Sequence, residues 1–468
     1  MAAPPDQGEF RSGPLYLRDA ALFTDLYQLT MAAAYLGEGM RETATFSLFA
    51  RRLPEARAFI VAAGLEDALE YARSFRFTPD ALAYIRSLGR FDEAFLGHLA
   101  DLRFTGEVRA VAEGTVVFPD EPLLEVTAPV IEAQLLETAL LNILHLQCVL
   151  ASKAARVTIA ARGRAVAEFG LRRSHGTDAG LKAARCAWIA GFESTSDVLA
   201  GKTYGIPLSG TMAHSFVTAF SDELEAFRAY ARAFPDTAVL LIDSYDTIEG
   251  AKKAVTVARE LSGAGKTLAG VRLDSGDLLE LSREVRRILD EAGCPGVRIL
   301  VSGGLDEHDV ERLLAAGAPI DAFGVGTRLN VSADAPSLDL VYKLVRYGSR
   351  DVLKLSEGKE TWVGAKAIYR TRAPAGKASG DVLALADEPP PPGAGASLLE
   401  PVMRGGELVR PHPPLANVRR HCLEQLAGLP EGLRLLRGHP EYPVQPSNAL
   451  RGRQAGALTR VREGGVSP

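Results

Sequence analysis

The chain has 468 residues, 47% of them hydrophobic and 24% charged, and a formal net charge of −5 at pH 7. This composition is typical of a water-soluble globular enzyme with two or three domains, or with one large barrel and additions. The negative balance argues against a nucleic-acid-binding surface but allows a local basic pocket for a phosphorylated small molecule. The four cysteines are far apart and form no CxxC pair, which excludes a zinc knuckle or a disulfide framework and fits a reducing cytoplasm.

The N-terminal half predicts a mixture of helices and short strands. Residues 1–10 lack the basic region and apolar core of a signal peptide, so we expect a cytoplasmic protein. Residues 22–36 predict a helix capped by Thr24, and residues 106–129 predict a small sheet. Residues 131–150 are strongly apolar but contain scattered polar side chains, so we expect a buried helix and no membrane association.

From about residue 165 onward, short apolar runs alternate with amphipathic helices. The runs are 164–170, 237–245, 268–276, 297–304 and 320–327, and the helices are 247–265, 278–294 and 306–318. This alternation predicts a parallel α/β structure whose strands are covered on both faces. Since no GxGxxG motif follows an early strand, a (β/α) barrel is favoured over a Rossmann sheet, with its chemistry at the carboxyl ends of the strands.

The last part of the chain breaks this pattern. Residues 352–373 predict strands with turns, and the proline-rich residues 388–396 predict a loop. The Gly- and Arg-rich tail from about residue 443 is expected to be mobile.

Two glycine-rich turns follow consecutive predicted strands, with the sequences LVSGG and FGVGT. Their exposed backbone N–H groups, beside helix N-termini, predict a cup for a phosphate monoester. The alternative is that the glycines only permit tight turns between strand and helix.

Polar side chains at the other strand ends each have two possible roles. Asp243, Asp274 and Asp277 could hold Mg²⁺, which prefers oxygen ligands, or could cap the following helices. Arg172 and its neighbour Arg173 suit an anion, or a surface salt bridge.

The stretch SGTMAHSF contains His214, one residue before a serine and just after a Gly-Thr turn. Such a histidine could cap a helix or fill a gap in the packing, or it could act as a nucleophile or a proton carrier. The local sequence leaves these alternatives open.

Six motifs in order are similar to those of the nicotinate phosphoribosyltransferase family: TDLYQLTM, EFGLRRSHG, GTMAHSF, VRLDSGDL, VSGGLDE and GVGTRL followed by YKLV. The resemblance extends from about residue 22 to about residue 370. It implies the type II phosphoribosyltransferase fold, an irregular (β/α) barrel with a second mixed α/β domain formed from both chain ends. We therefore expect an N-terminal domain over 1–130, a barrel over 131–345, and a segment over 346–468 that returns to the first domain.

The resemblance also implies a reaction. Nicotinate and phosphoribosyl pyrophosphate would give nicotinate mononucleotide and pyrophosphate in NAD salvage, with ATP as co-substrate hydrolysed to ADP and phosphate by an ATP-dependent ligase. Mg²⁺ is the expected cofactor. The family further implies a homodimer with active sites shared between subunits.

The resemblance assigns roles residue by residue. His214 would be transiently phosphorylated, with Arg272 and Asp274 as further catalytic residues. Tyr27, Thr211 and Arg272 would contact nicotinate, and Arg172 pyrophosphate or the nicotinate carboxylate. The sugar 5′-phosphate would bind Ser302, Gly303, Gly304, Gly326 and Thr327, while Asp243, Asp274 and Asp277 are the tentative magnesium ligands.

Other functions remain as alternatives. A nicotinamide or quinolinate phosphoribosyltransferase would share the fold. A barrel lyase or aldolase would need a Schiff-base lysine at a strand end, and the five apolar runs present none. A catalytically inactive regulator would not need His214 and Arg272. A secreted binding protein would need a signal peptide.

Overall fold

The protein is described here by a computed structural model covering residues 19–354, 361–374 and 376–463. The N-terminal segment used to assess a signal peptide lies outside these residues. The chain divides into two compact units: unit 1 comprises Met1–Ser152 and Ala335–Pro468, and unit 2 comprises Lys153–Asp334.

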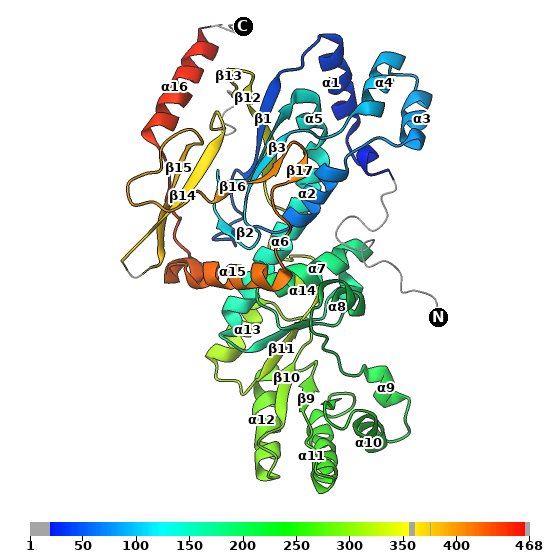
Figure 1. Ribbon diagram of the computed structural model, residues 1–468. Coiled ribbons are helices and arrows are strands. Elements are labelled where there is room, and N and C mark those ends of the chain that lie inside the picture. Colours follow the sequence, from blue (N-terminus) through cyan, green and yellow to red (C-terminus); the bar gives the residue numbers. More distant parts are fainter. Residues whose placement is uncertain (1–18, 355–360, 375, 464–468) are drawn as a thin grey trace. The chain divides into compact units, whose positions relative to one another are not determined.

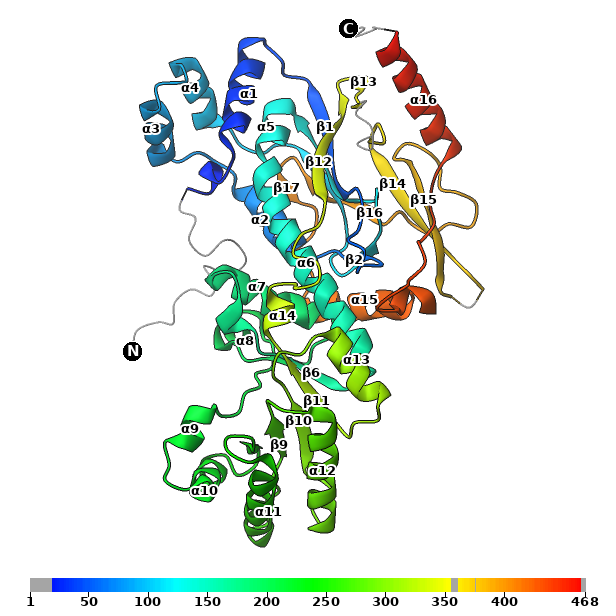
Figure 2. The ribbon, with the colours of Figure 1, turned by 180° about the vertical axis from the view of Figure 1, so that it is seen from behind.

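Unit 1 is built on an antiparallel sheet to which both ends of the chain contribute (Figures 1 and 2). In the described part of the chain its strand order is β13 (Arg350–Asp351), β12 (Leu340–Tyr347), β1 (Thr43–Ala50), β5 (Pro122–Pro129), β3 (Glu107–Val111), β16 (Leu399–Arg404) and β17 (Glu407–Leu408). The expected sharing of one domain by the two chain ends is thus present. Because β12 pairs with β1, the unit boundary precedes β12 and does not fall at 345/346.

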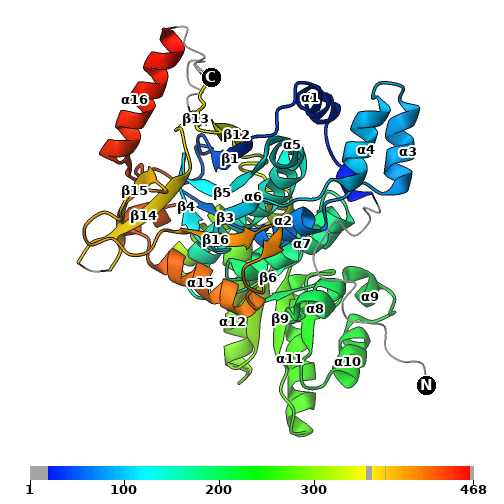
Figure 3. The same ribbon diagram turned by 45° about the horizontal axis from the view of Figure 1, so that its top comes forward.

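Helices cover this sheet and complete the unit 1 core. α5 (Val130–Leu135) packs on β1 and β5, and the Tyr342 hydroxyl of β12 donates a 2.8 Å hydrogen bond to the Ala133 carbonyl. Phe46 stacks on the same tyrosine ring, with centroids 4.8 Å apart. The other helices of the N-terminal part are α1 (Leu26–Gly37), α2 (Leu65–Ser74), α3 (Pro79–Ser87) and α4 (Glu93–Asp101), of which α3 and α4 form the pair beside α1 in Figure 3.

The helix predicted over 22–36 begins later than expected. Asp25, not Thr24, is the N-cap of α1, and a separate 3₁₀ turn, η1, covers Ala20–Leu22. The buried side chains of α1 are Gln28, Leu29 and Ala32.

The longest helix, α6 (Glu137–Ala161), is the apolar helix expected over 131–150, preceded by α5. Among the described residues it is the one helix long and apolar enough to cross a membrane, yet 78% of its most apolar window is buried inside the structure. A core helix has the same features. The boundary between the units falls inside α6, between Ser152 and Lys153, and not at 130/131 as predicted from the sequence.

The C-terminal segment forms a three-stranded sheet and helices. The sheet order is β14 (Lys366–Arg372), β15 (Ala378–Leu385) and β18 (Val444–Pro446), and the helices are α15 (Leu415–Ala427), the short η3 (Glu431–Arg434) and α16 (Asn448–Arg462). Residues 444–462 of the tail that was expected to be mobile thus contain a strand and a helix. Ser447 caps α16, and its face of Leu450, Gln454 and Ala457 is buried, a pattern hidden by the Gly- and Arg-rich composition.

Unit 2 is a parallel half-barrel, which confirms the predicted fold class. The strand order is β7 (Ser194–Thr195), β6 (Ala165–Glu168), β11 (Ala322–Val325), β10 (Arg298–Val301), β9 (Gly270–Leu273) and β8 (Val239–Leu241). β7 and β8 are its edges. A single bridge from Leu208 to Thr195 continues the sheet beyond β7, so this side of the barrel is irregular.

The predicted helices of unit 2 are present. α11 (Thr247–Gly263), α12 (Leu278–Glu291) and α13 (Glu307–Ala315) follow β8, β9 and β10, and α11 and α12 pack against β9 and β10 (Figure 1). Aspartates 246, 277 and 306 cap their N-termini. The remaining helices of this unit are η2 (Leu171–Arg173), α7 (Thr177–Ile189), α8 (Val198–Tyr204), α9 (His214–Thr218), α10 (Glu223–Ala233) and α14 (Thr327–Asn330).

Candidate functional site

The parallel strands of unit 2 bring most of the predicted site residues to one edge. Because all six strands run in the same direction, their carboxyl ends meet there. In spatial order this edge carries the Arg172 turn after β6, the Gly326 turn after β11, the Gly303 turn after β10, Asp274 after β9 and Asp243 after β8.

His214 and Asp243 form a pair at the β8 end of this edge. His214 is the first residue of α9, and its Nε2 lies 3.2 Å from Oδ1 of Asp243. The Asp243 carboxylate is almost completely buried, whereas the imidazole is 43% exposed. The second carboxylate oxygen, Oδ2, accepts hydrogen bonds from the Asp274 backbone N–H at 3.0 Å and the Ser275 hydroxyl at 2.6 Å. Asp243 is therefore fixed by its neighbours and orients an accessible histidine.

Arg272 lies beside Thr211, the other barrel residue predicted to contact nicotinate. Its Nη1 donates to the Thr211 hydroxyl at 2.8 Å and to the Met212 carbonyl at 3.2 Å, and Nη2 donates to Asp274 at 3.2 Å. The Nε atom is buried and has no hydrogen-bond partner among the described residues. A buried, unpaired guanidinium N–H is costly, so this donor is suited to a ligand acceptor.

The two glycine turns lie on neighbouring strands. Gly303 and Gly304 have φ values of +100° and +70°, which favour glycine. A Cβ at Gly303 would overlap the Asp274 carbonyl oxygen, and one at Gly326 would lie 2.7 Å from the Phe169 carbonyl oxygen. Tight backbone approach alone therefore requires both glycines, and phosphate binding at Ser302, Gly303, Gly304, Gly326 and Thr327 remains a prediction.

The tentative magnesium ligands do not form one group. The Asp277 carboxylate caps α12 by accepting from the Leu279 and Glu280 N–H groups, which is the alternative role considered for it. Asp243 holds His214 and the start of the next turn, and Asp274 accepts from Arg272 and the Ser302 hydroxyl. No group of three or more His, Cys, Asp and Glu side chains positioned to hold a metal ion occurs in the described part of the chain. These three residues thus do not fit a magnesium site made by the protein alone.

Arg172 and Tyr27 are accessible but their roles are untested. Arg172 lies in η2, at the same edge of the half-barrel, and is exposed. Tyr27 belongs to α1 of unit 1 and is 50% exposed, so it is not the buried helix residue that would argue against a binding role. Partial burial, together with the charges of Glu137 and Asp25, raises the pKa of Tyr27, so its hydroxyl keeps its proton.

Each unit contains a cavity of ligand size. In unit 2, a cavity of about 780 Å³ is lined largely from the amino-terminal ends of the strands, by residues such as Ala165, Val239, Gly270 and Ala322, and Thr211 is the one predicted site residue on its wall. Thr211 connects this cavity with Arg272. A volume of this size is suitable for a small molecule.

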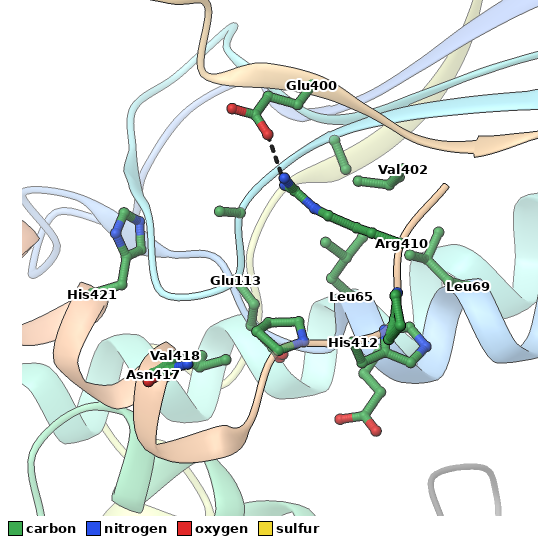
Figure 4. Close-up of a pocket in the computed structure, with 15 residues that line it drawn as sticks. Leu65, Leu69, Glu113, Glu400, Val402, Arg410, His412, Asn417, Val418 and His421 are labelled. Atoms are coloured by element: carbon green, nitrogen blue, oxygen red, sulfur yellow. Dashed lines mark hydrogen bonds and ion pairs between the residues drawn. The ribbon is translucent and has the colours of Figure 1, made fainter. Parts of the chain in front are cut away.

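The unit 1 cavity, of about 390 Å³, lies between α2, β3, β16 and the start of α15 (Figure 4). The polar groups on its wall are bonded within the protein: Arg410 to Glu400, His412 to Glu70, and His421 to Thr115. None of the predicted site residues lines it.

The half-barrel, joined to a mixed α/β unit made from both chain ends, is the fold of a type II phosphoribosyltransferase. Three family descriptions match the chain: nicotinate phosphoribosyltransferase N-terminal domain over 22–145, nicotinate phosphoribosyltransferase family over 165–355, and C-terminal domain over 394–453. The chain belongs to the nicotinate phosphoribosyltransferase family.

Individual relatives agree with this assignment. The chain is 50% identical over 445 residues to nicotinate phosphoribosyltransferase pncB2 of Mycobacterium tuberculosis, covering 94% of both chains. It is 44% identical over 377 residues to nicotinate phosphoribosyltransferase of Bacillus subtilis, covering 79% of this chain and 76% of the relative. A crystal structure of human nicotinic acid phosphoribosyltransferase matches with a TM-score of 0.84 at 34% identity, covering 92% of this chain and 99% of the other.

Two features of the site were not found from the sequence. Asp243 was expected as a metal ligand, and its pairing with His214 depends on how residues 205–213 run, which no periodicity encodes. Glu168, the last residue of β6, is buried and bonded to three loops; the only signal was an acidic residue ending an apolar strand.

Proposed function

We propose that the protein catalyses the transfer of the phosphoribosyl group from phosphoribosyl pyrophosphate to nicotinate, and that this transfer is coupled to ATP hydrolysis through a phosphohistidine at His214. Membership of the family and the relatives at 44–50% identity support the transferase activity. The products would be nicotinate mononucleotide, pyrophosphate, ADP and phosphate, in NAD salvage in the cytoplasm.

The His214–Asp243 pair is the observation that supports ATP coupling. If Nε2–H donates to Asp243, then Nδ1 carries the free lone pair and can attack the γ-phosphorus of ATP. The P–O bond to ADP breaks as the P–N bond forms, and ADP leaves with that bond's electron pair. Water later cleaves the P–N bond, which releases phosphate and restores the imidazole. The buried carboxylate stabilises the positive charge that the imidazole gains in the first step.

The transfer step requires positioning more than proton transfer. The pyridine nitrogen already has a lone pair, so it attacks the anomeric carbon as pyrophosphate departs. We assign the unpaired Arg272 Nε to the nicotinate carboxylate, beside Thr211, and the Gly303 and Gly326 turns to the 5′-phosphate. Arg172 is available for pyrophosphate. Mg²⁺ is proposed only as a companion of the substrate's phosphates, which would supply most of its ligands.

Labelling with γ-³²P ATP tests the phosphohistidine. Wild-type protein should acquire an acid-labile, base-stable label, and His214→Ala should acquire none while retaining slow, ATP-independent mononucleotide formation. His175→Ala is the matched control, because His175 is an exposed histidine that follows β6 at the same edge. Full labelling of the His214 variant would overturn the proposal.

The proposed homodimer, with Tyr27 of one subunit serving the His214 site of the other, is tested by complementation. Tyr27→Ala and His214→Ala chains are mixed under conditions of subunit exchange. Each heterodimer then has one site with both lesions and one with neither, so up to half of the wild-type activity per heterodimer should return. No recovery despite confirmed exchange would place both residues of one chain in one site.

A further inference from the structure

One buried carboxylate joins three of the loops that carry predicted site residues. Glu168 ends β6 and is only 1% exposed. Its Oε1 accepts a hydrogen bond from the Gly170 backbone N–H at 2.5 Å and from Asn330 Nδ2 at 3.0 Å, and its Oε2 accepts from the Thr195 hydroxyl at 2.6 Å. All these partners belong to unit 2.

The first loop is the turn that contains Arg172. Gly170 starts this turn, and its carbonyl accepts the Arg173 N–H at 2.8 Å. The turn is also held from its other side, because Asn330 Nδ2 donates to the Ser174 hydroxyl at 2.8 Å. A Cβ at Gly170 would collide with the Asn330 side chain, so the two loops are in direct contact.

The second loop leads to Thr211 and His214. Thr195 is fully buried, and its backbone bonds both Pro207 and Ser209, at 3.0 and 2.9 Å. These two bonds hold the irregular segment beyond β7. The Thr195 hydroxyl also accepts the Asp197 N–H at 3.0 Å, so its own hydrogen is directed to Glu168.

The third loop carries the proposed phosphate contact Thr327. Asn330 is the last residue of α14, whose first residue is Thr327. Asn330 is 4% exposed, and it reaches Glu168 and Ser174 with the two hydrogens of one amide group.

Three donors that converge on two oxygens fit an ionised carboxylate. The pKa of Glu168 is raised overall, chiefly by burial and also by the charge of Asp197, while the hydrogen bonds from Thr195, Gly170 and Asn330 lower it. A buried anion without a cationic partner is retained only when such donors satisfy it.

We infer that Glu168 is a positioning residue for the transfer reaction: it fixes the Arg172 turn, the segment leading to His214, and α14, which starts at Thr327, in one arrangement. It touches no substrate and acts through the backbone of these loops. The part of the inference that concerns catalysis rests on the proposed function of Arg172 and Thr327, whereas the part that concerns loop order does not.

Glu168→Gln is the primary test, because it keeps the side chain's shape. Its amide oxygen can still accept from Gly170 and Asn330, but its NH₂ group must face Thr195 and displace that hydroxyl's hydrogen. We expect the KM for phosphoribosyl pyrophosphate to rise about tenfold or more, with a fall in kcat. Glu168→Asp, which keeps the charge but is one methylene too short, should give an intermediate effect.

Val285→Ala, a buried position in α12 away from these loops, is the control for simple loss of stability. It should lower the melting temperature and leave both KM values unchanged. If Glu168→Gln also lowers the melting temperature without changing either KM, Glu168 does not position substrate contacts and that part of the inference is wrong.

Hydrogen exchange measured by mass spectrometry separates loop order from catalysis. Glu168→Gln should speed exchange in residues 170–174, 207–213 and 327–330 and not in 283–291, whereas Val285→Ala should do the reverse. Unchanged exchange in all three loops would overturn the inference whatever the kinetics show. Faster exchange with unchanged KM and kcat would show that Glu168 fixes the loops, but it would overturn its role in positioning the substrate contacts proposed at Arg172 and Thr327.

Discussion

Replacing Asp243 by Asn should strongly slow phosphorylation of His214 without unfolding the protein. The asparagine oxygen is expected to remain with the Asp274 N–H and the Ser275 hydroxyl, since these two donors are 3.0 and 2.6 Å from the present Oδ2. Its NH₂ group then faces Nε2 of His214. A donor at this position forces Nε2 to accept and moves the imidazole proton to Nδ1, so the nucleophilic lone pair is lost.

Two comparisons bound the expected fall in the rate of His214 phosphorylation. Loss of one charge-assisted hydrogen bond corresponds to about 1.5–3 kcal/mol, or roughly 10- to 150-fold in rate. A wrong histidine tautomer caused by the same change in a serine-protease triad costs about 10⁴-fold. We therefore expect phosphorylation to slow by about 10² to 10⁴-fold.

Rapid-quench labelling with γ-³²P ATP measures this rate, and equilibrium binding of ATP should change little. Asp246→Asn, three residues along, is the matched control, because that carboxylate caps α11 and does not contact His214. Ser275→Ala should slow labelling only a few-fold, since it removes one neutral donor from Asp243. Labelling of Asp243→Asn at the wild-type rate would refute the assignment of Asp243 as the orienting group.

Three further predictions address specificity, backbone geometry and pH. Arg272→Ala should weaken nicotinate by roughly 10- to 150-fold but nicotinamide much less, Arg272→Lys should recover little, and equal losses in a competition assay with nicotinate, nicotinamide and quinolinate would contradict its role. Gly303→Ala should lose activity and stability because its Cβ has no room, whereas Gly304→Ala, whose Cβ has open space, should fold at a cost of about 1–2 kcal/mol; equal melting temperatures would contradict this. Burial raises the pKa of Asp120 to about 6, opposed by Lys366, so the contribution of this group to the stability of the fold falls as the pH rises from about 4 to about 6. Asp120→Asn should consequently be more stable than wild type at pH 8, by at most about 3 kcal/mol, but not at pH 4, as urea unfolding at the two pH values would show.

The parallel part of the fold could be predicted because its local signals agree. Each strand of unit 2 from β8 to β10 is a short apolar run, and each following helix has an aspartate cap and an amphipathic face. Those signals fix which residues stand at the strand ends, and therefore most of the candidate site.

The contacts that give these residues their roles could not be predicted, since they are set by packing between distant segments. The pairing of His214 with Asp243 depends on the path of residues 205–213. A single bridge between Leu208 and Thr195 attaches this segment to β7, and such a bridge leaves no periodic pattern in the sequence. Likewise, nothing local distinguishes Asp277, which caps a helix, from Asp243, which holds a histidine. Capping and ligation use the same residue types after the same kind of strand.

The spatial order of the strands sets the distance between the two proposed phosphate sites. β10 and β11 are neighbours, so the two glycine turns proposed for the 5′-phosphate are adjacent, whereas β8, with Asp243 and His214, lies two strands from β10. Neighbouring strands are about 4.8 Å apart, so this separation is about 10 Å. That span separates the proposed 5′-phosphate site from the histidine that would react with ATP, and Arg272 lies on the intervening strand β9. The nicotinate carboxylate would then be held between these two phosphate sites.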